Sequence, residues 1–297
     1  MTRNPLVTVV IPSYNHQTYV AQSIQSVFSQ TYKEVELIVI DDGSSDASAK
    51  VIQKLMHGDK FKFIARKNRG LATTLNEGIK LAKGQYICFL ASDDYFMPKR
   101  VEHAVSRLKG SDDDLIAVYT DGLVMDSKNK KLSKFSDIYP RPFVGDVYSN
   151  LIVSNWIPAM GITYKTNLLK KFMFEEHFKI EDHVLYLKIF KGNKFKIIFY
   201  KGYDFCYRQH GGNMSNISKV MTYENKLIKN NFTDVKRHAE FLESIKKRSF
   251  SKIFNMNRYD LYLLSLKFLR FWVARIYLIK LKIVRCLSSF NIITSLK

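Results

Sequence analysis

Apolar runs alternate with amphipathic stretches along the first 90 residues of the chain. Helical spacing of the apolar positions predicts helices over about residues 19–30, 46–55 and 71–83. Short, nearly continuous apolar runs lie between them, as is typical of strands that a parallel sheet buries on both faces, and they cover residues 6–11, 36–40, 61–64 and 86–90. The strand centres recur every ~25–29 residues, which is the size of a strand–helix crossover unit. The pattern therefore predicts an α/β fold with a doubly wound sheet, whose ligand lies at the carboxyl ends of the strands.

Polar residues follow three of these strands directly. They are Pro12-Ser-Tyr-Asn15, Asp41-Asp-Gly-Ser44 and Ser92-Asp-Asp94. Acids grouped at one sheet edge repel one another and favour a cation, and a hard divalent ion suits a diphosphate substrate. Taken singly, each acidic segment is equally typical of a turn. The sequence contains neither GxxxxGK[ST] nor GxGxxG after the first strand, which excludes a P-loop and disfavours a dinucleotide-binding fold.

Short motifs continue beyond these strands, and their order is far more specific than any one of them. The series reads Val10-Ile-Pro-Ser-Tyr-Asn15, Val39-Ile-Asp-Asp-Gly-Ser44, Asn68-Arg-Gly70, Leu75-Asn-Glu-Gly78, Gly84-Gln-Tyr-Ile-Cys-Phe-Leu-Ala-Ser-Asp-Asp94, Trp156-Ile-Pro-Ala-Met-Gly161, Ile180-Glu-Asp182 and Tyr207-Arg-Gln-His-Gly-Gly-Asn-Met-Ser215. Over about residues 5–218 the chain thus resembles glycosyltransferase family 2.

The resemblance implies the GT-A fold, a Rossmann-like α/β domain with a mixed, mainly parallel sheet and helices on both faces. Residues 1–218 would form this catalytic domain, with a nucleotide-sugar half at about 1–97 and an acceptor half at about 98–218. The implied activity is inverting transfer of a sugar from a nucleotide-diphosphosugar, usually UDP-linked, with Mn²⁺ or Mg²⁺ as cofactor. Within the acceptor half, the lysine-rich residues 126–138 predict a solvated surface loop.

The resemblance also implies roles for residues of the donor site. Tyr14 would stack on the base, Pro12 and Ser13 would shape its pocket through backbone groups, Asp42 would accept from the uracil N–H, Asn68 would lie beside the nucleotide, and Ser92 and Asp93 would occupy the DxD-type position. Asp93 is the expected metal ligand, joined by Asp94 and His210. The first acid of the family pattern, a ribose contact in many members, is replaced here by Ala91.

The chemistry of an inverting transfer asks for a base that activates the acceptor hydroxyl and for positive charge that stabilises the leaving UDP. By resemblance, Asp182 is the base and Glu181 orients donor or acceptor hydroxyls; the alternative is that this pair caps a helix over residues 183–190. Arg208 lies in a segment that folds over the diphosphate in this family. Trp156 would stack on the acceptor, or else belong to the core. The remaining histidines, His16 among them, share no ligand spacing.

Charge sets the last part of the chain apart. The net charge is +20, and residues 219–297 hold 17 Lys/Arg against 5 Asp/Glu. At about 100° per residue, five cationic positions fall within an arc of about 140° and Lys280 alone falls elsewhere. Apolar positions lie opposite the arc: Lys267, Arg270, Arg275, Lys282 and Arg285 face Leu266, Leu269, Trp272, Val273, Ile276, Ile279, Ile283 and Leu287. Such a helix is typical of an anionic membrane surface. The alternative is that its apolar face packs on the body or on a second copy in a homodimer.

The leading interpretation is an enzyme that lies in the cytoplasm, peripheral on the inner face of the cell membrane. It would add sugars to a lipid-linked saccharide of a bacterial surface polysaccharide, such as O antigen or capsule. A protein or teichoic-acid acceptor and an inactive nucleotide-sugar binder are the alternatives. Nucleic-acid binding is disfavoured because the chain has no recognisable reader motif. Three cysteines without a CxxC pair give no disulfide framework or zinc module.

Overall fold

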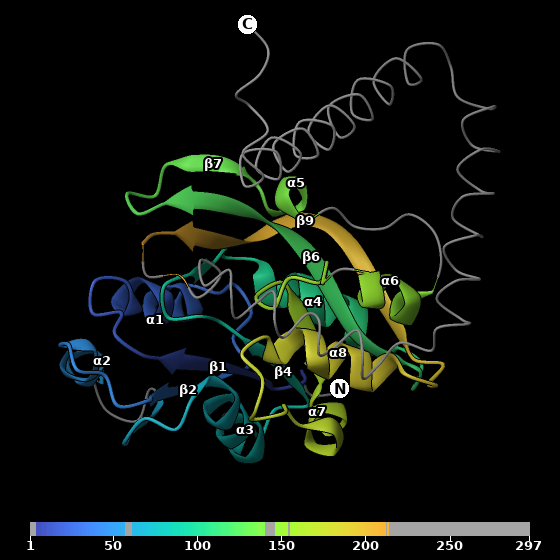
Figure 1. Cartoon of the computed structure of the whole chain (residues 1–297), viewed down its shortest axis with the longest axis horizontal. Helices are drawn as coiled ribbons and strands as arrows, with labels where there is room; N and C mark the ends of the chain where they lie inside the picture. Colours follow the sequence, from blue (N-terminus) through green and yellow to red (C-terminus); the bar gives the residue numbers. More distant parts are fainter. Residues whose placement is uncertain (1–3, 57–60, 140–145, 154, 212, 214–297) are drawn as a thin grey trace, which may run out of the picture. The chain divides into compact units, whose positions relative to one another are not determined.

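The computed structural model describes residues 4–56, 61–139, 146–153, 155–211 and 213 (Figure 1). The chain divides into two compact units, Met1–Val235 and Lys236–Lys297, and every described residue belongs to the first. The predicted boundary at residue 218 and the basic tail therefore lie outside the described residues. Within the described ranges, no helix combines the length and the apolar composition that a membrane crossing needs.

Strands and helices alternate through the first part of the body, as the hydrophobic pattern predicts. They are β1 (Val7–Ser13), α1 (Val20–Phe28), β2 (Val35–Asp41), α2 (Ser48–Leu55), β3 (Lys62–Ala65), α3 (Leu71–Leu81) and β4 (Tyr86–Phe89). β1 runs further than its apolar residues because it pairs with β2 in parallel as far as Ser13 opposite Asp41. Both strands therefore end on polar residues at the same sheet edge.

The second part of the body holds shorter and less regular elements. They are β5 (Tyr95–Phe96), α4 (Arg100–Leu108), β6 (Leu115–Asp126), β7 (Lys131–Lys134), α5 (Phe135–Ile138), α6 (Val147–Val153), β8 (Ile162–Lys165), α7 (Thr166–Phe172), α8 (Glu181–Phe190) and β9 (Lys196–Gln209). The prediction of a surface loop at residues 126–138 was wrong, because β7 pairs with the end of β6 as a hairpin and α5 follows it.

The strands form one mixed sheet in the order β3-β2-β1-β4-β8-β6-β9-β5, with β7 beside β6. β3, β2, β1 and β4 are parallel, and β8 runs antiparallel to both of its neighbours. β5 follows Asp94 and pairs antiparallel with β9, with Tyr95 opposite Cys206. This pairing brings Arg208 at the end of β9, and His210 just after the strand, beside the loop that follows β4.

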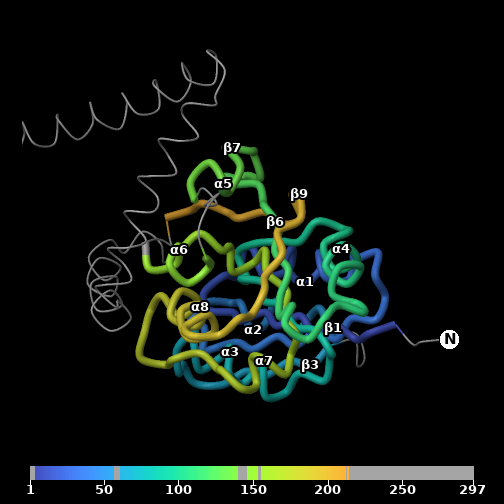
Figure 2. Tube along the Cα trace, turned by 90° about the vertical axis from the view of Figure 1, so that its right-hand side faces the viewer, coloured from blue at the N-terminus to red at the C-terminus, as the bar shows by residue number. Residues whose placement is uncertain are grey.

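Helices cover both faces of the sheet, and alternate strand residues serve the two cores. Val9 and Ile11 pack with residues of α1, α2 and α4, whereas Val10 packs with residues of α3, α6, α7 and α8. α4 and α8 accordingly lie on opposite sides of the sheet (Figure 2). α3 sits close to β1, since a Cβ on Gly78 would come within 2.5 Å of the Val10 side chain. The predicted layers of the GT-A fold are confirmed in this arrangement.

Candidate functional site

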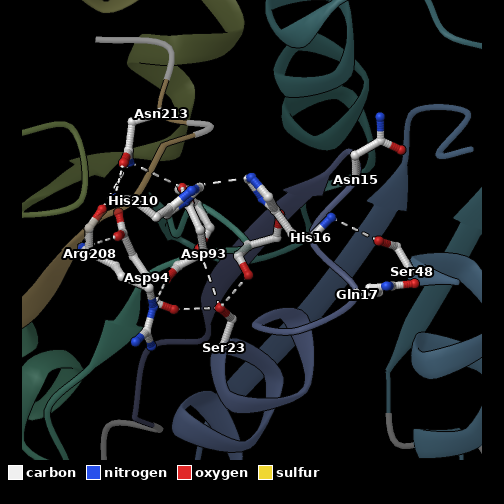
Figure 3. Close-up of polar contacts among 12 residues, drawn as sticks. Asn15, His16, Gln17, Ser23, Ser48, Asp93, Asp94, Arg208, His210 and Asn213 are labelled. Atoms are coloured by element: carbon white, nitrogen blue, oxygen red, sulfur yellow. Dashed lines mark hydrogen bonds and ion pairs between the residues drawn. The ribbon is translucent and has the colours of Figure 1, made fainter. Parts of the chain in front are cut away.

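The loop after β1 turns sharply and is tied to the loop after β2. Asn15 has a φ of 56°, in the left-handed region that Asn tolerates better than most residues. Its N–H donates to Ser44 Oγ at 2.9 Å, and its Oδ1 accepts from Ser45 N–H at 2.8 Å. The His16 N–H donates to Ser48 Oγ at 2.9 Å. These bonds fix the backbone of His16 and direct its ring toward the loop after β4 (Figure 3).

The loop after β4 carries Ser92, Asp93 and Asp94, and all three are buried. The Ser23 hydroxyl, from α1, lies 2.9 Å from the Ser92 carbonyl and also contacts the Asp94 carbonyl. Asp94 Oδ1 accepts the backbone N–H of Arg208 at 2.7 Å. Burial and the neighbouring Asp93 raise the pKa of Asp94 well above its usual value. The Asp94 carboxylate thus fastens the loop to β9.

Arg208 is the central anchor of this loop, and its side chain is only 1% exposed. Its Nε donates to the Asp93 carbonyl at 2.8 Å, and its two terminal nitrogens donate to Asn129 Oδ1 and Gln22 Oε1, each at 2.6 Å. The guanidinium also lies over the Tyr19 ring, 4.7 Å from its centroid. This burial argues against the predicted role of Arg208 in orienting the donor or the acceptor, and its bond to the Asp93 carbonyl favours a role in positioning Asp93.

Three side chains with metal-ligand atoms meet at this point: Asp93, His210 and His16. His210 Nε2 lies 3.0 Å and His16 Nε2 lies 3.8 Å from Asp93 Oδ2, and the three ligand atoms all lie within 4.8 Å of one another (Figure 3). One carboxylate and two imidazoles form a donor set that suits a divalent first-row metal ion. The predicted ligands Asp93 and His210 are thus brought together. Asp94 does not belong to this group, and His16 stands in its place.

The electrostatics of this group favour neutral imidazole at His16. Burial lowers the pKa of His16, the neighbouring His210 lowers it further, and Asp93 opposes both effects. A neutral ring keeps a nitrogen lone pair available as a ligand. Ser92 Oγ lies 2.8 Å from His16 Nδ1, so the hydroxyl predicted to contact the donor also contacts this ring.

The expected base site lies at the ends of β1 and β2. Tyr14 is 48% exposed and is therefore available for stacking. Pro12 and Ser13 belong to β1, and the Ser13 carbonyl accepts the Asp42 N–H at 2.8 Å. Ser13 Oγ is buried and has no hydrogen-bond partner among the described residues.

Asp42 has partners that its predicted role did not anticipate. One of its oxygens accepts the Arg69 N–H and the other the Gly70 N–H, both at 2.8 Å, and Arg66 adds an ion pair. Because the side chain of Asp42 is thus engaged and buried, the structure argues against a direct bond to uracil. Gly43 has a φ of 74°, and a Cβ at this position would lie 2.5 Å from the backbone nitrogen of Asn68. Asn68 itself is exposed.

Asp182 and Glu181 open α8. Asp182 Oδ2 accepts from Asn155 Nδ2 at 3.0 Å, and Oδ1 accepts the His183 N–H at 2.7 Å. Burial raises the pKa of Asp182, which makes its carboxylate a stronger base. The residue that precedes the helix is Ile180, which has no side-chain cap bond, and Asp182 accepts the His183 N–H from within the first turn.

Trp156 belongs to the core. Its side chain is 7% exposed and packs edge-on against Tyr119, with 5.5 Å between the ring centroids. The prediction that Trp156 stacks on the acceptor was wrong, and the core alternative is confirmed.

Comparison with known proteins agrees with the fold. Residues 8–183 match the family model of glycosyl transferase family 2. The chain belongs to this family. It is 30% identical to chondroitin synthase of Escherichia coli over 262 residues, which are 86% of this chain and 36% of that protein. It is 37% identical to an uncharacterized glycosyltransferase of Rickettsia typhi over 131 residues, 44% of this chain and 41% of the relative. The chain thus spans less than half the length of these two relatives.

Two solved structures share the fold of this family 2 member. TarS 1–349 of S. aureus, in complex with UDP-GlcNAc, has a TM-score of 0.60 at 21% identity and aligns over 83% of this chain and 73% of its own. The mannosyltransferase PcManGT of Pyrobaculum calidifontis, in complex with GDP-Man and Mn²⁺, has a TM-score of 0.53 at 19% identity and aligns over 70% of this chain and 57% of its own. The predicted GT-A fold is therefore confirmed.

Several residues of this family 2 member escaped the sequence analysis. His16 is adjacent to the Pro12–Asn15 motif, and its position at the end of the first strand was the available signal. Ser23 and Asn155 gave no signal, because each acts through a contact with a distant segment.

Proposed function

We propose that this chain transfers a sugar from a UDP-linked donor to a saccharide acceptor, with inversion at the anomeric carbon. The observation that carries the proposal is the ligand group around Asp93, at the sheet edge where β1, β2 and β4 end. The likeness to TarS with UDP-GlcNAc and to a mannosyltransferase with GDP-Man and Mn²⁺ supports a nucleotide-diphosphosugar donor.

The donor site would use the residues described above. Asp93 and His210 would hold Mn²⁺ or Mg²⁺, which when bound supplies positive charge to the diphosphate of the leaving group. Tyr14 stacks on the base, Pro12 and Ser13 line its pocket through their backbone, Asn68 lies beside the nucleotide, and Ser92 keeps the loop and ring of His16 in register. Arg208 holds the Asp93 backbone in place.

Asp182 is the proposed base. It accepts the proton of the acceptor hydroxyl while that oxygen forms a bond to the anomeric carbon. The bond from that carbon to the diphosphate oxygen breaks, and UDP leaves with its electron pair. Attack on the face opposite the leaving group inverts the configuration. The raised pKa of Asp182 supports this role, and Glu181 orients hydroxyls of the donor or the acceptor.

The proposed acceptor is a lipid-linked saccharide of a bacterial surface polysaccharide, as in O antigen or capsule. Similarity to chondroitin synthase supports a saccharide acceptor. The excess of Lys/Arg in residues 219–297 supports docking of this segment on the inner face of the cell membrane. Residues 1–218 would form the catalytic domain.

A donor screen tests the proposal without a known acceptor. Full-length protein is incubated with a panel of UDP-sugars and Mn²⁺, and release of UDP is measured for the wild type, for Asp93→Ala and for Asp113→Ala, an exposed acid away from the site. We expect slow hydrolysis of one donor, lost in Asp93→Ala and kept in Asp113→Ala. Equal hydrolysis by all three proteins, or none with any UDP-sugar, would contradict the proposal. Proton NMR of the transfer product then tests inversion.

A further inference from the structure

The ring of His16 is held in one orientation by the surrounding loops. Its backbone N–H is bonded to Ser48 and its Nδ1 lies 2.8 Å from Ser92 Oγ, so Nε2 is left facing Asp93 (Figure 3). The ring stands at 90° to that of His210, with 5.6 Å between centroids. Two imidazoles thus approach one carboxylate oxygen from different directions.

The separations of the two histidine nitrogens from Asp93 are those of a shared ion. A metal bound at about 2.0–2.2 Å from each ligand places adjacent ligand atoms about 3 Å apart and opposite ones at most about 4.4 Å apart. His210 Nε2 and His16 Nε2 lie 3.0 and 3.8 Å from Asp93 Oδ2, inside this range. The 3.8 Å separation is too long for a hydrogen bond, so a direct bond between His16 and Asp93 does not explain the placement.

Ser92 gives His16 the partner that a metal-binding histidine usually has. Ligating histidines donate their other ring N–H to a neighbouring acceptor, which fixes the tautomer and the orientation of the ring. In the tautomer that carries its proton on Nδ1 and donates it to Ser92 Oγ, His16 presents an unprotonated Nε2 to the point that Asp93 and His210 also face.

We propose that His16 is a third protein ligand of the metal ion, and that it gives the site a preference for first-row transition ions over Mg²⁺. This inference rests on the proposed function, which needs a divalent ion at Asp93. Imidazole nitrogen is a ligand of transition ions, whereas Mg²⁺ keeps oxygen ligands and water. The site offers two nitrogens and one carboxylate oxygen. Its ratio of Mn²⁺ affinity to Mg²⁺ affinity is therefore higher than that of an all-oxygen site of equal charge.

The test measures metal binding directly. Full-length protein is stripped with chelator and titrated with Mn²⁺ in the presence of UDP, and bound Mn²⁺ is counted by EPR. We expect His16→Ala to weaken Mn²⁺ binding at least about tenfold, the lower range for losing a group that supports a metal site. His103→Ala is the matched control, because His103 also pairs with a carboxylate, Asp204, but lies outside the group, and its Mn²⁺ affinity should equal that of the wild type.

Two further readouts keep the test independent of folding. Pulsed EPR of Mn²⁺ on the wild type should show nitrogen couplings from two imidazoles, and from one in His16→Ala. In His16→Glu an oxygen ligand of similar reach replaces nitrogen, so the ratio of Mn²⁺ to Mg²⁺ affinity, measured by competition, should fall. Circular dichroism and melting of each variant show whether it is folded.

The outcomes separate the inference from the proposed function. If Asp93→Ala loses Mn²⁺ while His16→Ala keeps wild-type affinity, or if the wild type shows one imidazole, His16 is a structural residue and the inference is overturned, but the metal site at Asp93 stands. If the wild type with UDP binds no Mn²⁺, both the inference and the metal-dependent function fail.

Discussion

Replacing Asp182 by Asn tests the catalytic base with little change of shape. Asp182 accepts two hydrogen bonds, from Asn155 Nδ2 and from the His183 N–H. The new amide would set its NH₂ against one of these donors. Asn155 can relieve this by turning its amide over, because its Oδ1 is buried and has no partner among the described residues. The turned oxygen then accepts from the NH₂ of the substituted side chain, so we expect the Asp182→Asn protein to fold.

The size of the effect follows from the proton that the variant cannot take. Loss of a positioned base costs ~10²–10⁴-fold in turnover, or about 2.7–5.4 kcal/mol of transition-state stabilisation. Donor affinity should change little, since no donor contact is assigned to Asp182. In the wild type the acid limb of the kcat/KM profile should lie above the ordinary Asp value of about 3.9, because burial raises the pKa of Asp182.

The same burial has an effect on stability with a definite sign. Between the ordinary pKa and the raised one, the unfolded chain has lost the Asp182 proton and the folded chain has kept it. The free energy of unfolding of the wild type therefore falls as pH rises through this window, relative to that of Asp182→Asn. Melting temperatures of the two proteins, compared from about pH 4 to about pH 8, should diverge in favour of the variant.

Steady-state kinetics with saturating donor and acceptor, together with donor titration by calorimetry, are the assays, and Asp113→Asn at an exposed position is the control. If Asp182→Asn keeps its turnover, another group is the base. If it loses donor affinity in place of turnover, Asp182 is a donor ligand and the reasoning is refuted.

Four further predictions concern other parts of the protein. Asp93→Ala should lower turnover at least ~10²-fold, and the residual activity should no longer respond to Mn²⁺ or EDTA in a kinetic assay. Arg208→Met removes buried charge-assisted bonds and should cost about 3–5 kcal/mol of unfolding free energy in a denaturant titration; retained stability would contradict its anchoring role. Tyr14→Ala should weaken UDP binding by about 1–3 kcal/mol, measured by calorimetry, whereas Tyr203→Ala, similarly exposed but on β9, should not. Truncation after Ile217 should abolish co-sedimentation with anionic vesicles and transfer to a lipid-linked acceptor while UDP-sugar hydrolysis continues; a truncated protein that still binds such vesicles would refute the membrane role of the tail.

The hydrophobic pattern predicted the parallel part of the sheet well because three of its four strands, β1, β2 and β4, are largely buried on both faces. β4 is apolar throughout, and β1 and β2 are nearly so. Such continuous apolar runs indicate strands with both faces buried. The later strands lack this property. β5 has two residues, and much of β9 alternates between exposed and partly buried positions, so their pairing depends on neighbours that local sequence does not identify.

Residue types at the site could be predicted, but their contacts could not. The acids after β2 and β4 lie where the strand order places them. The partners that decide their roles come from far along the chain: Arg208 reaches Gln22, 186 residues away, and Asn129, 79 residues away. His16 lies beside the candidate ligands at positions 93 and 210, and no local motif has this spacing.

Adjacent acids can have opposite roles, and Asp93 and Asp94 show the physical reason. Two buried neighbouring carboxylates repel, and each needs its own compensation. Asp94 receives it from the protein, through the Arg208 N–H and the nearby guanidinium charge, yet its raised pKa indicates that this compensation falls short of the cost of burial. Asp93 faces two imidazoles, and burial lowers the pKa of His16, which reduces the positive charge that this ring supplies to Asp93. A bound divalent ion would provide that charge for Asp93 directly and weaken its repulsion of Asp94. In the proposed function the acid pair would therefore combine one anchor with one ligand, and the anchor would place the ligand where an ion can bind it.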